Sequence, residues 1–78
     1  MKKIAMESVV LTTEAVAAWH VVAKRAAAAV RALGVRREDV SEEEIWISDD
    51  EATLVIKCQA GPLEVSMDVP AGQWSWNN

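Results

Sequence analysis

The sequence contains few of the residues on which small domains usually rely. Its 78 residues include one cysteine, one histidine, three glycines and two prolines, and no phenylalanine or tyrosine. One cysteine cannot close an internal disulfide, and one histidine beside it cannot complete a structural zinc site. Three glycines are too few for a loop that cradles phosphates. We therefore expect no cofactor and no bound metal.

Long hydrophobic runs are also missing. Polar side chains interrupt the alanine- and valine-rich stretch 15–33 at His20, Lys24, Arg25 and Arg31. A stretch broken in this way is not expected to span a membrane. In the N-terminal segment two lysines follow Met1, but Glu7 and the polar residues 12–14 break the apolar run that a signal peptide requires. With an unpaired cysteine, which fits a reducing compartment, these features predict a cytoplasmic protein.

Charge is abundant, and it is divided unequally along the chain. Residues 1–37 carry seven bases and two acids, whereas residues 38–78 carry ten acids and only Lys57 as a base. The first part has a net charge of +5, the second −9, and the whole chain −4. Such a division gives a strong dipole that steers partners without specifying any chemistry. A net negative charge repels nucleic acid, so we expect a protein partner.

The short chain also favours self-association. A core formed by so few residues leaves only about 3–5 kcal/mol of net stability, and small domains commonly add a disulfide, a metal or a second subunit. The first two are excluded by composition. We therefore expect a homodimer.

The spacing of apolar residues predicts one α+β domain over residues 1–78. In this fold one long helix packs on a mostly antiparallel sheet of four or five strands, in the order β-α-β-β-β. Residues 4–11 are expected to form the first strand, and residues 14–33 the helix. Thr12 or Thr13 would cap the helix and Gly34 would end it. The predicted core face of the helix comprises Val16, Trp19, Val22, Ala23, Ala26, Ala27, Val30 and Leu33.

After the helix the apolar period changes from 3.6 to 2, which indicates strands. Ser41 and Glu44 have the spacing of a capping box, so a single helical turn is expected before the sheet. Strands are expected at 45–47, 53–59 and 63–69, with a short edge strand at 73–76. Leu54, Ile56 and Cys58 would face the helix. The opposite face of the sheet would stay uncovered and would carry Trp46, Thr53, Val55, Lys57, Glu64, Ser66 and Asp68.

Two acidic clusters are candidate binding elements. They are Glu42-Glu43-Glu44 and Asp49-Asp50-Glu51. Neither has the interleaved spacing or the central glycine of a calcium loop, so we expect solvated acids or contact with a basic partner instead of a metal. An alternative hypothesis is that the acids of residues 38–51 imitate nucleic-acid phosphates and occupy a basic groove.

Nucleophilic catalysis is not predicted. His20 and Cys58 are the only candidate base and nucleophile, yet Cys58 falls on the inward face of its strand and His20 on the basic side of the helix. An alternative is an oligomeric enzyme or small-ligand binder whose pocket forms between subunits around His20 and Trp19.

The tryptophans point more directly to a contact surface. Trp74 and Trp76 alternate in a segment of small and polar residues, and Trp46 lies in a strand flanked by isoleucines. Tryptophan is enriched at interface hot spots, although the same residues could instead seal the core. The sequence therefore predicts a small, acidic, non-enzymatic protein-interaction module. By analogy of size and acidity it would be an inhibitor or adaptor from a phage or mobile element. Its predicted partner-binding residues are Trp46, Asp49, Asp50, Glu51, Trp74 and Trp76.

Overall fold

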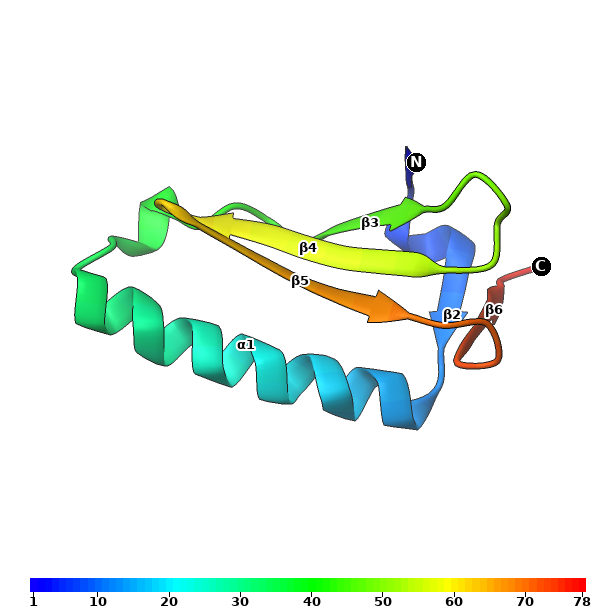
Figure 1. Ribbon diagram of the computed structural model, residues 1–78, viewed down its shortest axis with the longest axis horizontal. Coiled ribbons are helices and arrows are strands. Elements are labelled where there is room, and N and C mark those ends of the chain that lie inside the picture. The colour runs from blue at the N-terminus through cyan, green and yellow to red at the C-terminus, as the bar shows by residue number, and fades with distance from the viewer.

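One long helix and two antiparallel sheets make up the fold (Figure 1). The computed structural model describes all residues from Met1 to Asn78 and measures 40 × 23 × 18 Å. The main sheet has the strand order β1-β3-β4-β5, and a separate ribbon pairs β2 with β6. The predicted α+β class is confirmed. The elements are β1 (Lys2–Ile4), β2 (Val9–Leu11), α1 (Thr13–Leu33), β3 (Glu44–Ile47), β4 (Leu54–Ala60), β5 (Leu63–Val69) and β6 (Trp74–Trp76), with 3₁₀ turns η1 (Met6–Ser8) and η2 (Arg37–Asp39).

Both ends of α1 are capped as predicted. The Thr12 hydroxyl oxygen accepts a hydrogen bond of 3.2 Å from the amide of Ala15, which satisfies one of the free donors in the first turn. At the other end Gly34 adopts a left-handed conformation with φ of 71°. Its amide bonds back to the carbonyl of Arg31, at 3.2 Å. These caps limit the helix to the stretch between a threonine and a glycine.

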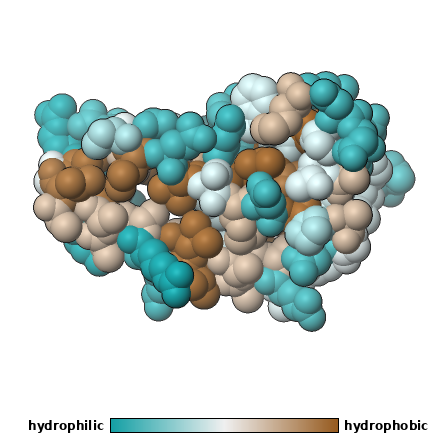
Figure 2. Space-filling model, viewed as in Figure 1, coloured by the Kyte–Doolittle hydropathy of each residue, from teal (hydrophilic) through white to brown (hydrophobic).

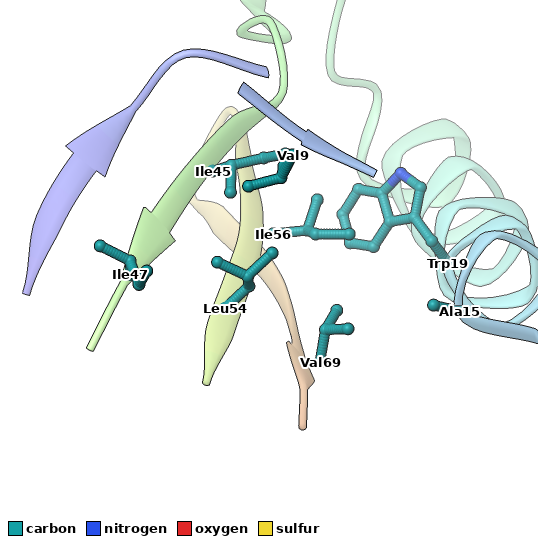
Figure 3. Close-up of a cluster of buried hydrophobic side chains, with 8 residues drawn as sticks. All are labelled: Val9, Ala15, Trp19, Ile45, Ile47, Leu54, Ile56 and Val69. Carbon is teal, nitrogen blue, oxygen red and sulfur yellow. The ribbon is translucent and has the colours of Figure 1, made fainter. Parts of the chain in front are cut away.

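The core lies between the sheet and the N-terminal half of α1 (Figure 3). Ala15 and Trp19 reach from the helix toward the buried side chains of the strands. Leu54 and Val69 are completely buried at the centre. The buried cluster comprises Val9, Ala15, Trp19, Ile45, Ile47, Leu54, Ile56 and Val69.

The predicted core face of the helix was wrong at its margins. Ala15 is fully buried, whereas Val16 is 39 % exposed and Leu33 is 57 % exposed. The buried stripe of the helix is centred near Ala15, Trp19 and Ala26. Successive residues of a helix are about 100° apart, so the side chain of Val16 lies at the edge of this stripe and is partly exposed. Leu33 belongs to the same stripe, but it lies in the last turn, where the helix and the sheet no longer pack closely.

The strands of the main sheet follow the predicted alternation. On β5, Val69 is buried and Leu63, Val65 and Met67 are half-buried, while the intervening side chains are exposed. Adjacent strands pair in register, with Ile45 opposite Ile56 and Ile56 opposite Met67. A one-residue shift would move every one of these side chains to the other face. The register therefore fixes which residues face the helix.

The first predicted strand is divided in two. Residues 4–11 do not form one strand, because η1 interrupts them between β1 and β2. The amide and the hydroxyl of Ser8 both donate to the carbonyl of Ala5, which closes this turn. β1 then pairs with β3, and β2 pairs with β6 in the separate ribbon. A serine that bonds back to the backbone offers the chain an alternative to a continuous strand.

The predicted capping box at Ser41 and Glu44 was also wrong. The helical turn of this connector is η2, and Ser41 instead ties the connector to β4. Its hydroxyl oxygen accepts a hydrogen bond of 2.7 Å from the amide of Gln59, and its own amide donates to the carbonyl of Gln59, also at 2.7 Å. A long-range bridge to the sheet thus replaces a local helix start.

The two ends of the molecule are built from different elements. One end holds the β2–β6 ribbon, both termini and the turn between β3 and β4 (Figure 1). The other holds the last turn of α1, η2 and the β4–β5 hairpin. There Gly61 has a φ of 58°, and a Cβ atom on it would lie 2.9 Å from a methyl group of Val35, so a side chain would not fit. No helix combines the length and apolarity needed to cross a bilayer.

Candidate functional site

The acidic turn between β3 and β4 is held by its own hydrogen bonds. Asp50 accepts two of them, from the hydroxyl of Ser48 at 2.6 Å and from the amide of Ala52 at 3.1 Å. The Ser48 hydroxyl oxygen accepts in turn from the amide of Thr53 at 3.1 Å. Glu51 has a φ of 56°, which is uncommon for a residue with a side chain. The turn is therefore a closed, preorganised unit.

The three carboxylates of this turn have different environments. The hydrogen bonds from Ser48, and then from the amide of Ala52, lower the pKa of Asp50 below its ordinary value. The Asp50 carboxylate is therefore ionised, and its hydrogen bonds are made within the turn. The side chain of Asp49 is 95 % exposed and lies 2.7 Å from the amino group of Met1. Glu51 is exposed and forms no side-chain hydrogen bond or ion pair. Asp49 and Glu51 are thus the exposed carboxylates of the turn, and Asp49 is paired with the amino group of Met1.

The two C-terminal tryptophans lie beside this turn and have unequal roles. The indole Nε1 of Trp74 donates to the carbonyl of Ala52 at 3.1 Å, and its ring packs against the core cluster. Trp76 stands edge-on to Trp74, with ring centroids 5.3 Å apart, and is 41 % exposed. Both rings lie on one side of β6, as their alternation predicts. Trp74 seals the core, whereas Trp76 presents its ring to solvent.

The strand paired with β6 adds apolar surface at the same end. Val10 is 49 % exposed, and Met6, in the turn before β2, is 47 % exposed. Asn77 holds the tail against this segment through bonds to the carbonyls of Glu7 and Ser8. Val10 pairs with Ser75 and Trp76 pairs with Val9, so Val10 and Trp76 point to opposite faces of the ribbon. We name the surface formed by Asp49, Glu51 and Trp76 the ribbon-end surface.

Trp46 lies elsewhere, on the face of the main sheet that the helix leaves open. The Nζ atom of Lys57 is 4.4 Å from the centroid of the Trp46 ring, which is a cation–π contact. Its indole donates to Glu44 at 3.2 Å, and Glu44 also pairs with Lys3 at 3.0 Å. The hydrogen bonds from Lys3, and then from Trp46, lower the pKa of Glu44. Trp46 is thus engaged with its own neighbours.

The remaining acids of residues 38–44 are largely engaged as well. Glu38 and Asp39 pair with Arg36, at 3.6 and 3.3 Å. Glu43 accepts a hydrogen bond of 3.1 Å from the indole of Trp19. These acids are distributed over a connector and a strand and do not form one row of free carboxylates.

His20 and Cys58 do not share a site. Cys58 lies on the inner side of β4, in a groove beneath α1 that Trp19 also lines. His20 is exposed and lines a shallow depression on the outer side of the helix, with Val21 and Lys24. Burial, and then the nearby charge of Glu43, raise the pKa of the Cys58 thiol, which keeps it protonated near neutral pH. No cluster of three or more histidine, cysteine or acidic side chains has the geometry of a metal site.

Sequence reasoning missed two elements of this region. Ser48 was not among the candidate residues, yet it organises the acidic loop through Asp50. The serine–aspartate spacing carries a signal for such side-chain turns. The exposure of Met6 and Val10 had no sequence signal, because it follows from the division of the first strand. No family model, curated protein or solved structure matches this chain.

Proposed function

We propose that the protein acts by contact and not by catalysis, and that it binds a protein partner with a basic surface through the ribbon-end surface. The observation that carries this proposal is the position of Trp76. Its ring is partly exposed, stands edge-on to Trp74, and lies next to a turn with two exposed carboxylates, Asp49 and Glu51. A rigid aromatic beside fixed charges is typical of an interface hot spot, because little conformational entropy is lost on binding.

The chemistry of this surface defines its partner. The ring of Trp76 offers apolar area, and Asp49 and Glu51 offer negative charge beside it. A matching partner would carry an apolar recess with lysine or arginine beside it. The acidic half of the chain would speed the encounter with such a surface. An inhibitor or adaptor that covers a basic site on another protein would work in this way.

Quantitative affinity capture from a lysate of the source organism tests the proposal. Three baits are compared with the wild type: Trp76→Ala, the double variant Asp49→Asn/Glu51→Gln, and the control Glu64→Gln/Asp68→Asn. The control removes the same two charges from the open sheet face. We expect the wild type and the control to capture equal amounts of one partner. Trp76→Ala should capture at least tenfold less of it, and Asp49→Asn/Glu51→Gln should also capture less than the wild type.

A salt series distinguishes the proposal from nucleic-acid mimicry by residues 38–51. A tryptophan-anchored contact should persist between 50 and 300 mM salt, roughly the range over which exposed charges become screened. If binding of the partner fell steeply with salt and Trp76→Ala still bound it, nucleic-acid mimicry would be favoured. That result would contradict binding through the ribbon-end surface.

A further inference from the structure

A wide apolar groove separates the C-terminal half of α1 from the sheet. It has a volume of about 610 Å³ and is lined by both layers and by the connector between them. In the space-filling view apolar residues gather around the hollow over the helix and the hairpin (Figure 2). The groove lies at the opposite end from the ribbon-end surface.

The groove stays open because the side chains facing it are short. Beyond Trp19 the helix presents Ala23 and Ala26, and the sheet presents Cys58 and Ala60. Packed layers stand about 10 Å apart, and side chains of this size cannot fill that distance. Apolar area therefore remains in contact with water.

Apolar side chains at the border of the groove are exposed as well. Val40, on the groove wall, is 40 % exposed, and Leu33, just beyond it on the last turn of α1, is 57 % exposed. Val30 and Val35 are half-buried. Exposed apolar side chains rimmed by charges are common at interaction sites.

The charges at the rim identify the occupant. Arg31 and Arg37 line the groove from α1 and η2, and Glu43 lines it from the segment before β3. None of the three takes part in an ion pair within the chain. In a two-fold contact, if a residue meets a second residue in the other copy, the reciprocal contact forms too, so a surface pairs with itself when opposite charges lie on opposite sides of the axis. A second copy would place its Glu43 against the arginines, and its arginines against Glu43.

Other occupants fit less well. A small anionic ligand would meet the arginines but also Glu43, in a protein whose net charge is −4. Self-pairing of the free edge strand β5, in the register centred on Ser66, would place Glu64 opposite Asp68 of the second copy, which is repulsive.

We propose that this groove is the interface of a symmetric homodimer. The last turns of α1 of each copy, including Leu33, lie against the groove of the other, and the two rims pair through opposite charges. The dimer buries the apolar area that the single chain leaves in water. This inference does not rest on the ribbon-end surface, which stays free at both far ends of the dimer.

Sedimentation equilibrium between about 5 and 500 μM tests the proposal with a matched pair of variants. Ala26→Glu places a carboxylate in the groove, and Ala28→Glu places the same residue on the exposed side of the helix. The wild type and Ala28→Glu should be dimers. Ala26→Glu should weaken dimerisation at least about 100-fold, because it buries an unpaired charge. Unchanged circular dichroism shows that the variant is folded, and retained partner capture separates this result from a failure of the ribbon-end surface.

The thiol of Cys58 provides a second readout, which uses the wild-type protein alone. Its rate of reaction with a disulfide reagent should fall as the wild-type concentration rises through the dimerisation range. Wild type at the mass of one chain throughout the range would overturn the proposal. So would a dimer that Ala26→Glu leaves intact, or a native mass spectrum of one chain carrying a bound small molecule.

Discussion

The indole Nε1 of Trp19 donates a hydrogen bond of 3.1 Å to the Oε1 atom of Glu43, 24 positions later in the chain. The bond joins α1 to the segment before β3, at the point where close packing of the two layers ends. On one side of it Ala15 and the sheet form the core. On the other side the groove opens. The pair therefore fixes how far the helix is held against the sheet.

Removing the acceptor of this bond should destabilise the fold. We expect Glu43→Ala to lower the free energy of unfolding by about 1 kcal/mol, because the buried ring loses the partner of its polar atom. Glu43→Gln keeps a carbonyl oxygen at the same place and should cost less than half as much. Urea denaturation measures both. The neighbour Glu42, whose side chain makes no hydrogen bond, is the control. An equal loss in Glu42→Ala would show that the bond contributes nothing specific.

The two C-terminal tryptophans should separate stability from binding. Trp74→Ala should cost about 2–3 kcal/mol, since it removes a core contact and the bond to Ala52. For a domain of this size that corresponds to a melting temperature lowered by roughly 10–20 °C. Trp76→Ala should lower it by only a few degrees. Deletion of residues 73–78 should resemble Trp74→Ala in thermal unfolding. A deletion that leaves the melting temperature unchanged would contradict the packing of β6.

Acid should weaken the fold through Glu44 and Asp50. Their pKa values in the folded state lie below the ordinary values of 4.5 and 3.8. Carboxylates of this kind stabilise the fold above their unfolded pKa values, and the contribution is lost as the pH falls through the folded values. The urea midpoint should therefore be steady near neutral pH and decline below about pH 4.5.

A pair of double variants checks the origin of this decline. Glu44→Gln/Asp50→Asn should be less stable at pH 7 and should lose less on acidification than the wild type. Glu64→Gln/Asp68→Asn should keep the wild-type profile, because neither carboxylate makes an ion pair. If the second variant flattened the profile as much as the first, the hydrogen bonds to Glu44 and Asp50 would not be the cause.

Divalent cations should not bind specifically to the acidic turn. Asp50 is occupied by Ser48 and Ala52, which leaves Asp49 and Glu51 as too few oxygen ligands for a hard cation. Calorimetric titration with calcium, magnesium, manganese and zinc should give no stoichiometric heat at micromolar concentrations. A saturable one-to-one isotherm with any of these ions would contradict the arrangement of the turn.

The parts of the fold that sequence predicted are those set by local chemistry. Thr12 and Gly34 bound the helix through caps that their residue types favour, and the alternation over 63–69 fixes the faces of β5. The errors lie where distant residues compete with local signals. Ser41 has the spacing of a capping box, but a pairing with Gln59 prevails. The division of residues 4–11 depends on two different partner strands, which no local pattern specifies.

The sequence singled out Asp49, Glu51 and Trp76 among other candidates, but it did not specify how they are arranged. Alternation correctly placed Trp74 and Trp76 on one side, yet only the fold makes the first a core residue and the second an exposed one. The charges of residues 49–51 were evident, but the sequence did not distinguish Asp50, which closes the turn, from its neighbours. The groove was unforeseen, because the helix pattern predicted a face packed along its whole length.

Proton–nitrogen correlation spectra of the labelled protein, titrated with the captured partner, test the proposed contact most directly. The four tryptophan indoles give four separate signals, of which Trp74 and Trp76 report on the ribbon end, Trp46 on the open sheet face and Trp19 on the groove. We predict that the indole signal of Trp76 shifts together with the amides of residues 49–51, while those of Trp19 and Trp46 stay in place. Shifts centred on Trp46 and the open sheet face, with Trp76 unmoved, would contradict a partner bound at the ribbon-end surface.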